Sequence, residues 1–140
     1  MKDIIDLLAR VLIAFIFLYE AYDSIAFFKL TKEKMLSYGL TWQPDLLLTG
    51  GIFLLILGGI LVLIGYRSGF GATLLLLYWI PVTFIVHAWW GETIPEVRRL
   101  ESLQFMKNLA IIGGLLIIIV NGSGRYSIKR LFATTKVRQR

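Results

Sequence analysis

The fold is decided by residues 46–65, which read LLLTGGIFLLILGGILVLIG and contain no charged side chain. At about 1.5 Å per residue, a helix of this length crosses the roughly 30 Å of hydrocarbon in a bilayer. A second run of the same kind, residues 70–90 (FGATLLLLYWIPVTFIVHAWW), begins after the short polar turn at 66–69. The two runs therefore predict an antiparallel pair of membrane-spanning helices.

Two further apolar runs extend this pair to four helices, at about residues 4–28 and 103–120. The composition agrees, because 57% of the 140 residues are hydrophobic and the mean hydropathy is +0.74, well outside the range of soluble domains. No internal repeat or second domain is indicated. The prediction is an all-α membrane protein, a single bundle of four transmembrane helices over residues 1–140 that ends in a basic tail at about 122–140.

The distribution of charge orients the predicted bundle. An even number of spans puts both termini on one side of the membrane, together with the turn at 66–69. Because basic residues are retained in the cytoplasm, this basic side is predicted to be cytoplasmic, and the formal net charge of +6 reflects orientation rather than nucleic-acid binding. The side has two acidic residues, Asp3 and Asp6, and these basic ones: Lys2, Arg10, Arg67, Arg125, Lys129, Arg130, Lys136, Arg138 and Arg140.

Small residues mark the predicted packing surfaces. In the run at 46–65, glycines recur every seven residues, which places them on nearly one face of a helix and lets another backbone approach closely. A glycine pair offers a similar surface in the run at 103–120. We predict that these surfaces join the two helices directly or form an oligomer interface. The glycines are Gly51, Gly58, Gly59, Gly65, Gly113 and Gly114.

Five polar side chains fall at similar depth, in the half of the bilayer away from the termini. Glu20 and Asp23 share one face of the first helix, His87 lies late in the third, and Lys107 and Asn108 lie early in the fourth. Polar groups at membrane depth are costly and often functional. Two interpretations stay open: an internal ion-pair network that joins three helices, or a proton-exchanging site whose donors bind the carbonyl oxygens of a quinone.

Other chemistry is less well supported by the sequence. The chain has no cysteine and a single histidine, so it offers no disulfide, no thiolate site and no metal-ligand spacing. No nucleophile and base occur at a known catalytic spacing, and catalytic residues stay unassigned. Arg10, about one turn inside the membrane, is expected to extend toward lipid phosphate.

Several stretches along the chain form one pattern: Leu8–Arg10, Ile64–Arg67, His87, Phe105–Gly114 and Gly122–Ser127. On these residues the sequence resembles the DoxX family of small four-helix proteins of the bacterial inner membrane. The resemblance implies a multi-pass inner-membrane localisation and a role beside a quinone-linked redox complex.

Three functional hypotheses follow. The first is a DoxX-like membrane subunit that assists an electron-transfer complex, with quinone as its cofactor. The second is a non-enzymatic scaffold or accessory subunit, whose partners are the bilayer and other membrane proteins or a second copy of the chain. The third is a small proton-coupled transporter, which the acidic pair Glu20 and Asp23 would permit.

Overall fold

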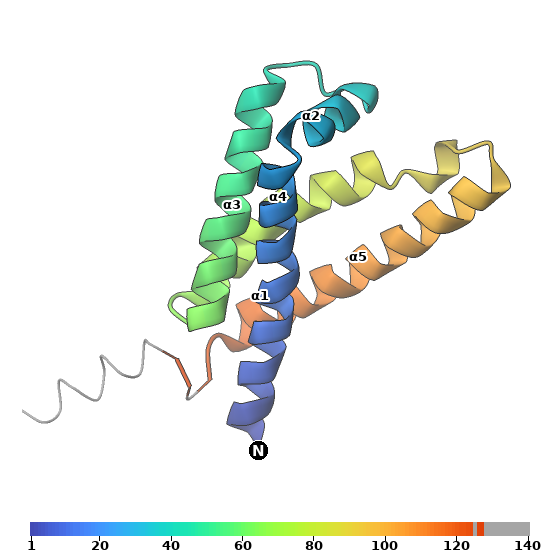
Figure 1. Cartoon of the computed structure of the whole chain (residues 1–140). Helices are drawn as coiled ribbons and strands as arrows, with labels where there is room; N and C mark the ends of the chain where they lie inside the picture. Colours follow the sequence, from blue (N-terminus) through green and yellow to red (C-terminus); the bar gives the residue numbers. More distant parts are fainter. Residues whose placement is uncertain (125, 128–140) are drawn as a thin grey trace, which may run out of the picture.

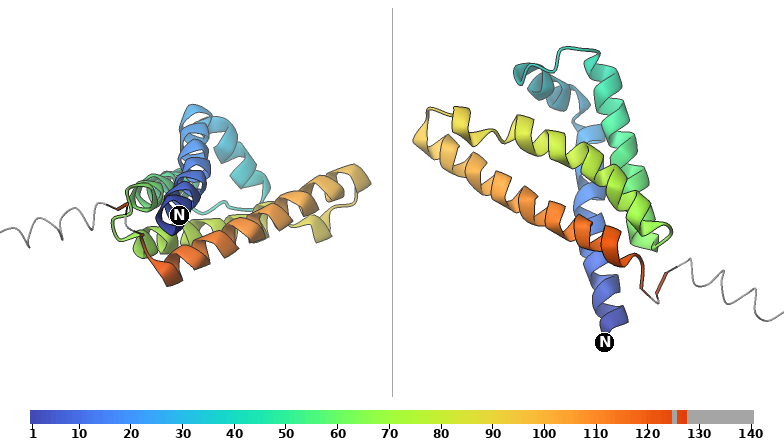
Figure 2. Two further views of the ribbon diagram at one scale, coloured as in Figure 1. Left: turned by 90° about the horizontal axis from the view of Figure 1, so that it is seen from below. Right: turned by 180° about the vertical axis from the view of Figure 1, so that it is seen from behind.

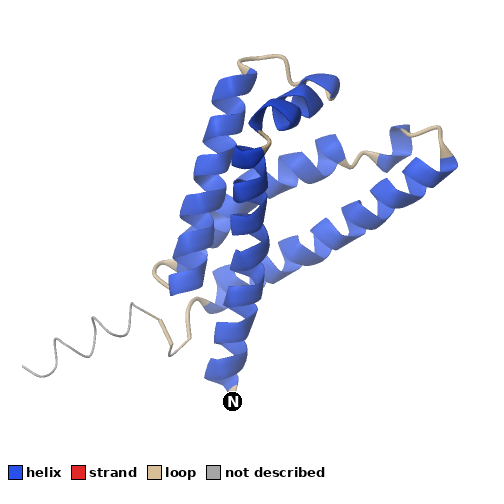
Figure 3. Cartoon of the chain, viewed as in Figure 1, coloured by secondary structure: helices blue, strands red, loops and turns tan. Residues whose placement is uncertain are grey.

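The computed structural model describes residues 1–124, 126 and 127, which form helices and connecting loops without a strand (Figures 1 and 3). This confirms the all-α class. Residue 125 and most of the predicted basic tail, residues 128–140, lie outside the described part. The helices are α1 (Lys2–Ala26), α2 (Phe28–Ser37), α3 (Pro44–Ile64), α4 (Ser68–Val86), the short 3-10 helix η1 (Trp89–Gly91) and α5 (Pro95–Asn121).

Three segments are long and apolar enough to cross a membrane: α3, the stretch Ser68–Gly91 that includes α4, and α5. Helix α1 is also long, at 25 residues, but it carries charged side chains near both ends. Because of these charges, the composition of α1 does not place it among the three apolar segments. The chain is therefore an all-helical membrane protein with at least three helices of spanning character.

The helices are not equally covered by one another. Helix α3 packs against both α1 and α4, whereas α5 packs mainly against α4 and touches α1 only slightly. Figures 1 and 2 show that α5 lies beside α1 near the N-terminus and diverges from it toward Pro95. We call the end with the N-terminus, the α3–α4 turn and residues 122–124, 126 and 127 the terminal end. The opposite end, with α2 and η1, is the loop end.

The core is a layer of aliphatic and aromatic side chains contributed by all four long helices. Phe17 of α1 meets Trp79 of α4 edge to face, with ring centroids 4.9 Å apart. Such contacts and close packing hold the helices together in place of the hydrophobic effect, which is weak in lipid. The fully or almost fully buried apolar side chains are Ala14, Phe17, Ala21, Leu48, Leu55, Val62, Ala72, Leu75, Leu76, Trp79, Phe105, Leu115 and Ile118.

The glycines of α3 lie in two of these contacts. A Cβ at Gly58 would stand 2.9 Å from the carbonyl oxygen of Gly71, so α3 and α4 can approach closely only because both positions are glycine. A Cβ at Gly59 would stand 2.9 Å from Leu18 of α1. The predicted stripe is thus shared between α4 and α1, and α5, the other helix with a glycine pair, packs on α4 rather than on α3.

Helix boundaries differ from the predicted ones at the loop end. The first helix stops at Ala26, because Phe27 takes a non-helical backbone conformation, and the chain turns into α2 where a polar loop was expected. Helix α5 begins at Pro95 instead of about residue 103. Proline is well suited to a first helical position, where its missing N–H has no partner to lose.

Candidate functional site

The predicted polar group is partly assembled at the loop end. Glu20 and Asp23 are half-buried on the last turns of α1, and His87 is half-buried at the C-cap of α4. Asp23, His87 and Lys34 of α2 all act electrostatically on Glu20. The structure therefore places two carboxylates, an imidazole and an ammonium group from three helices in one neighbourhood.

His87 has a specific partner that the sequence did not indicate. Its Nδ1 lies 2.6 Å from Oε2 of Glu101, and this pair joins the end of α4 to the second turn of α5. Both side chains are only 21–25% exposed. Pro95 could have indicated this pair, because a helix that begins there includes Glu101. The predicted helix began at about residue 103 and therefore left Glu101 outside it.

Carboxylates also surround the loop that follows α2. Burial raises the pKa of Tyr38, and the negative charges of Glu101 and Glu92 raise it further. Both effects favour the protonated phenol, which can donate a hydrogen bond. The loop end thus combines acidic groups from α1, from α5 and from Glu92, the residue after η1, with a neutral donor.

Lys107 and Asn108 do not share a surface. Lys107 is exposed, whereas Asn108 is 6% exposed at the α4–α5 contact. The amide Nδ2 of Asn108 lacks a hydrogen-bond partner among the described residues, and so does Nε1 of Trp79, another side chain that is 6% exposed. Nε1 of Trp89, in η1, is a third buried donor of this kind. Buried N–H donors without an acceptor are costly and are the kind of group a bound ligand can satisfy.

These positions test the fit of a quinone. Asn108 could donate to a carbonyl oxygen, but His87 is already bonded to Glu101, and Lys107 faces away from the interior. The three donors predicted for the ligand therefore do not converge on one space. Among residues 1–124, 126 and 127, no group of three His, Asp or Glu side chains could hold a metal ion.

The terminal end contains a polar site that the sequence interpretation missed. Arg10 was expected to reach lipid phosphate, but its side chain is fully buried. Its Nε donates to Oδ2 of Asp6 at 2.9 Å, and its Nη1 donates to the carbonyl oxygens of Val62 and Leu63 at 3.3 and 3.2 Å. Nη2 donates to the carbonyl oxygen of Tyr126. The guanidinium therefore caps the C-terminal end of α3, whose last carbonyls lack the usual helical N–H four residues on, although the Val62 carbonyl also accepts from the Gly65 N–H.

The segment after α5 completes this site. The Ser123 hydroxyl donates to the carbonyl oxygen of Gly65 at 2.6 Å and lies 2.7 Å from the Ser68 hydroxyl. The Gly124 N–H donates to Asp6 at 3.0 Å. Gly65, with φ +69°, has no room for a Cβ, which would stand 2.6 Å from the Arg10 guanidinium. We call this site the arginine lock. It consists of Asp6, Arg10, Gly65, Ser68, Ser123, Gly124 and the carbonyl group of Tyr126.

Comparison with known proteins identifies the family. The sequence matches the model of the SURF4 family over residues 1–132. The chain belongs to the SURF4 family. This finding overturns the predicted DoxX assignment, which is wrong. Half of the residues on which that resemblance rested are glycines and aliphatic side chains, which packed membrane helices share regardless of family.

Individual relatives agree with the SURF4 assignment. The inner membrane protein YqjF of Escherichia coli (strain K12) is 30% identical over 131 residues, which cover 94% of each chain. The inner membrane protein YphA of the same organism is 26% identical over 129 residues, 92% of this chain and 91% of YphA. The Surfeit locus protein 4 homolog of Drosophila melanogaster is 28% identical over 130 residues, 91% of this chain but only 40% of its own length.

No solved structure matches the chain. Two of the SURF4-family relatives are named inner membrane proteins, and the structure has three helices of spanning length and composition. The predicted localisation, a multi-pass protein of the bacterial inner membrane, is therefore confirmed.

Proposed function

We propose that this SURF4-family chain is a non-enzymatic accessory subunit that binds another membrane protein through one face of α5. In this proposal the chain crosses the membrane four times with both termini in the cytoplasm. The length of α1 and the burial of Arg10 support the fourth span, because the lock removes the charge of Arg10 from lipid. A reporter fused after Arg140 is expected to be active only in the cytoplasm, and activity outside it would refute this topology.

The observation that carries the proposal is the surface around Gly113. A Cβ at Gly113 would meet nothing within 4 Å, whereas Gly51, Gly58, Gly59 and Gly114 are all filled by neighbouring helices. Gly113 is thus a small residue whose close-approach surface is unused within the chain. Small residues on lipid-facing helices favour association with another helix, because they let backbones approach.

The neighbours of Gly113 extend this surface along α5. Exposed side chains lie one and two helical turns before and after Gly113. Another side of α5 is covered, mainly by α4. The resulting strip is apolar, with a shallow centre and larger side chains at both ends, a shape that fits one helix of a partner. The strip consists of Met106, Ala110, Gly113, Ile117 and Val120.

A matched pair of glycine substitutions tests the proposal. Gly113→Leu fills the strip without an internal clash, and Gly50→Leu makes the same change at another open glycine, on α3. We expect gently purified wild-type chain and Gly50→Leu to retain a stoichiometric membrane-protein partner by native mass spectrometry, and Gly113→Leu to lose it. Equal retention by Gly113→Leu, or a wild-type chain that carries no partner, would refute the proposal. A retained second copy would identify the partner as the chain itself.

A second candidate function is suggested by two of the unpaired donors, which lie on middle turns of α4 and α5. Trp79 Nε1 and Asn108 Nδ2 would suit an apolar ligand with oxygen acceptors, of which a quinone is one example. Extraction of bound quinones from wild type and from Asn108→Leu tests this function, and Lys107→Ala is the matched control because Lys107 is exposed. Quinone that is retained by Lys107→Ala and lost from Asn108→Leu would support it, and wild type without quinone would exclude this ligand.

A further inference from the structure

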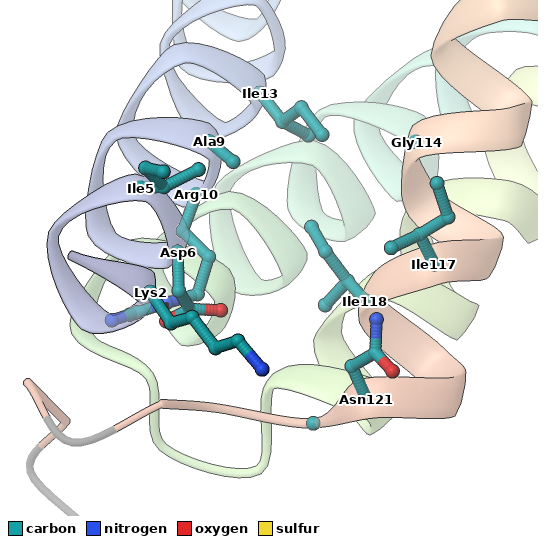
Figure 4. Close-up of a pocket in the computed structure, with 11 residues that line it drawn as sticks. Lys2, Ile5, Asp6, Ala9, Arg10, Ile13, Gly114, Ile117, Ile118 and Asn121 are labelled. Carbon is teal, nitrogen blue, oxygen red and sulfur yellow. Dashed lines mark hydrogen bonds and ion pairs between the residues drawn. The ribbon is translucent and has the colours of Figure 1, made fainter.

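A groove of about 350 Å³ lies between α1 and α5 at the terminal end. Figure 4 shows aliphatic side chains of α1 facing those of α5 across this groove, with the two helices only slightly in contact. Its walls are almost wholly apolar. They are formed by Ile5, Ala9, Ile13, Gly114, Ile117 and Ile118.

The groove is polar at one end only. Lys2 and Asn121 lie at its terminal end, and Figure 4 shows the Lys2 side chain reaching into the gap there. Asp6 and Arg10 also border the groove, but they are bonded to each other within the lock. Among the described residues that line the groove, the charge left for an occupant is therefore the positive charge of Lys2.

The depth of the groove matches one leaflet of a bilayer. At about 1.5 Å per residue, the wall of α1 from Lys2 to Ile13 rises about 16 Å, and half of a hydrocarbon core is about 15 Å. The volume is consistent with this length. At about 30 Å³ for a group the size of a water molecule, 350 Å³ holds roughly a dozen methylene-sized groups, which is a single hydrocarbon chain.

We propose that this groove binds one acyl chain of an anionic phospholipid, whose head group lies against Lys2 and Asn121. Given the cytoplasmic termini proposed above, the lipid comes from the cytoplasmic leaflet. The acyl chain lies between Ala9 and Ile117, and the phosphate is attracted by the Lys2 ammonium at the membrane surface. A lipid held here fills a space between α1 and α5 that the protein side chains leave open.

Two substitutions separate the acyl chain from the head group. In nanodiscs of phosphatidylcholine with a minor fraction of phosphatidylglycerol, native mass spectrometry is expected to show one retained phosphatidylglycerol on wild type. Ala9→Trp fills the groove, and we expect retention to fall more than about tenfold, since several buried methylenes are lost. Lys2→Gln should lower the preference for phosphatidylglycerol over phosphatidylcholine by about fivefold, the effect of one basic residue near the surface.

Controls keep the proposal falsifiable if a variant folds poorly. Leu12→Trp adds the same ring to an exposed position of α1 outside the groove, and it should retain lipid like wild type. On the unaltered chain, phosphatidylglycerol with a photoactivatable diazirine on its acyl chain should label peptides containing residues 5–13 or 114–118. Labelling confined to other peptides, or equal retention by Ala9→Trp and wild type, would overturn the proposal.

Discussion

The buried polar groups are hydrogen-bonded more completely at the terminal end of the bundle than toward the loop end. At the terminal end, the buried Arg10 finds a carboxylate and three backbone carbonyls, and the segment after α5 closes over it. At the loop end, α5 has moved away from α1; His87 is paired with Glu101 there, but the buried Nε1 of Trp89 lacks a partner among the described residues, as do the donors of Trp79 and Asn108 farther inside the bundle. The contrast indicates that stability is concentrated at the terminal end, while the loop end keeps unsatisfied groups of the kind found at binding sites.

The largest effect is expected from breaking the lock at its centre. Arg10→Met would remove the guanidinium from the end of α3 and from Asp6, which is 27% exposed and keeps the bond from the Gly124 N–H. Because breaking a fully buried ion pair costs about 3–5 kcal/mol, we expect a loss near the lower end of that range, about 3 kcal/mol. Arg99→Met, at an exposed position of α5, is the control. Thermal unfolding in detergent should show a strong loss of stability for Arg10→Met alone, and an equal effect of both changes would contradict the assignment of the lock.

A smaller effect is expected where the lock holds the last segment. Ser123→Ala removes the bond to the Gly65 carbonyl and the contact with Ser68, and a net loss of about 1–2 kcal/mol follows from leaving these partly buried groups unpaired. Ser102→Ala makes the same change in the first turns of α5 at the loop end. If Ser123→Ala and Ser102→Ala lower the free energy of unfolding equally, the segment after α5 contributes little to stability.

The smallest effect is expected at the loop end, and it sharpens the comparison. Asn108→Leu replaces a buried side chain of similar size and removes the unpaired Nδ2 donor, so the free energy of unfolding should change by less than about 1 kcal/mol in either direction. The same detergent unfolding measurement checks it. A loss as large as that of Arg10→Met would mean that Asn108 supports the fold, and the contrast between the ends would fail.

Much of the fold could be predicted because lipid imposes simple rules. The apolar runs at 46–65 and 70–90 correspond to α3 and α4 within a few residues, and the short turn between them forces an antiparallel pair. The early start of α5 was missed because residues 95–102 are polar, and hydropathy does not register a helix that continues beyond the membrane. Helix α2 was missed for the same reason.

The candidate site was predictable in composition but not in pairing. The sequence placed Glu20, Asp23 and His87 at one level, and the structure brings them together. It could not show that His87 pairs with Glu101, or which of the adjacent residues Lys107 and Asn108 faces the interior, because these depend on the rotation of α5. Arg10 was misjudged because lipid phosphate and the end of a neighbouring helix are both suitable partners for a guanidinium.

The arginine lock also bears on how the chain is made. Its bonds from Tyr126 and Gly124 to Arg10 and Asp6 join residues separated by 116 and 118 positions. Translation delivers α1 to the membrane before the segment that follows α5, so the guanidinium has an incomplete set of partners until Gly124 and Tyr126 have been made. A nascent chain interrupted before Gly122 would leave that cation partly unsatisfied in the bilayer. The lock can therefore form only after all four long helices have been synthesised.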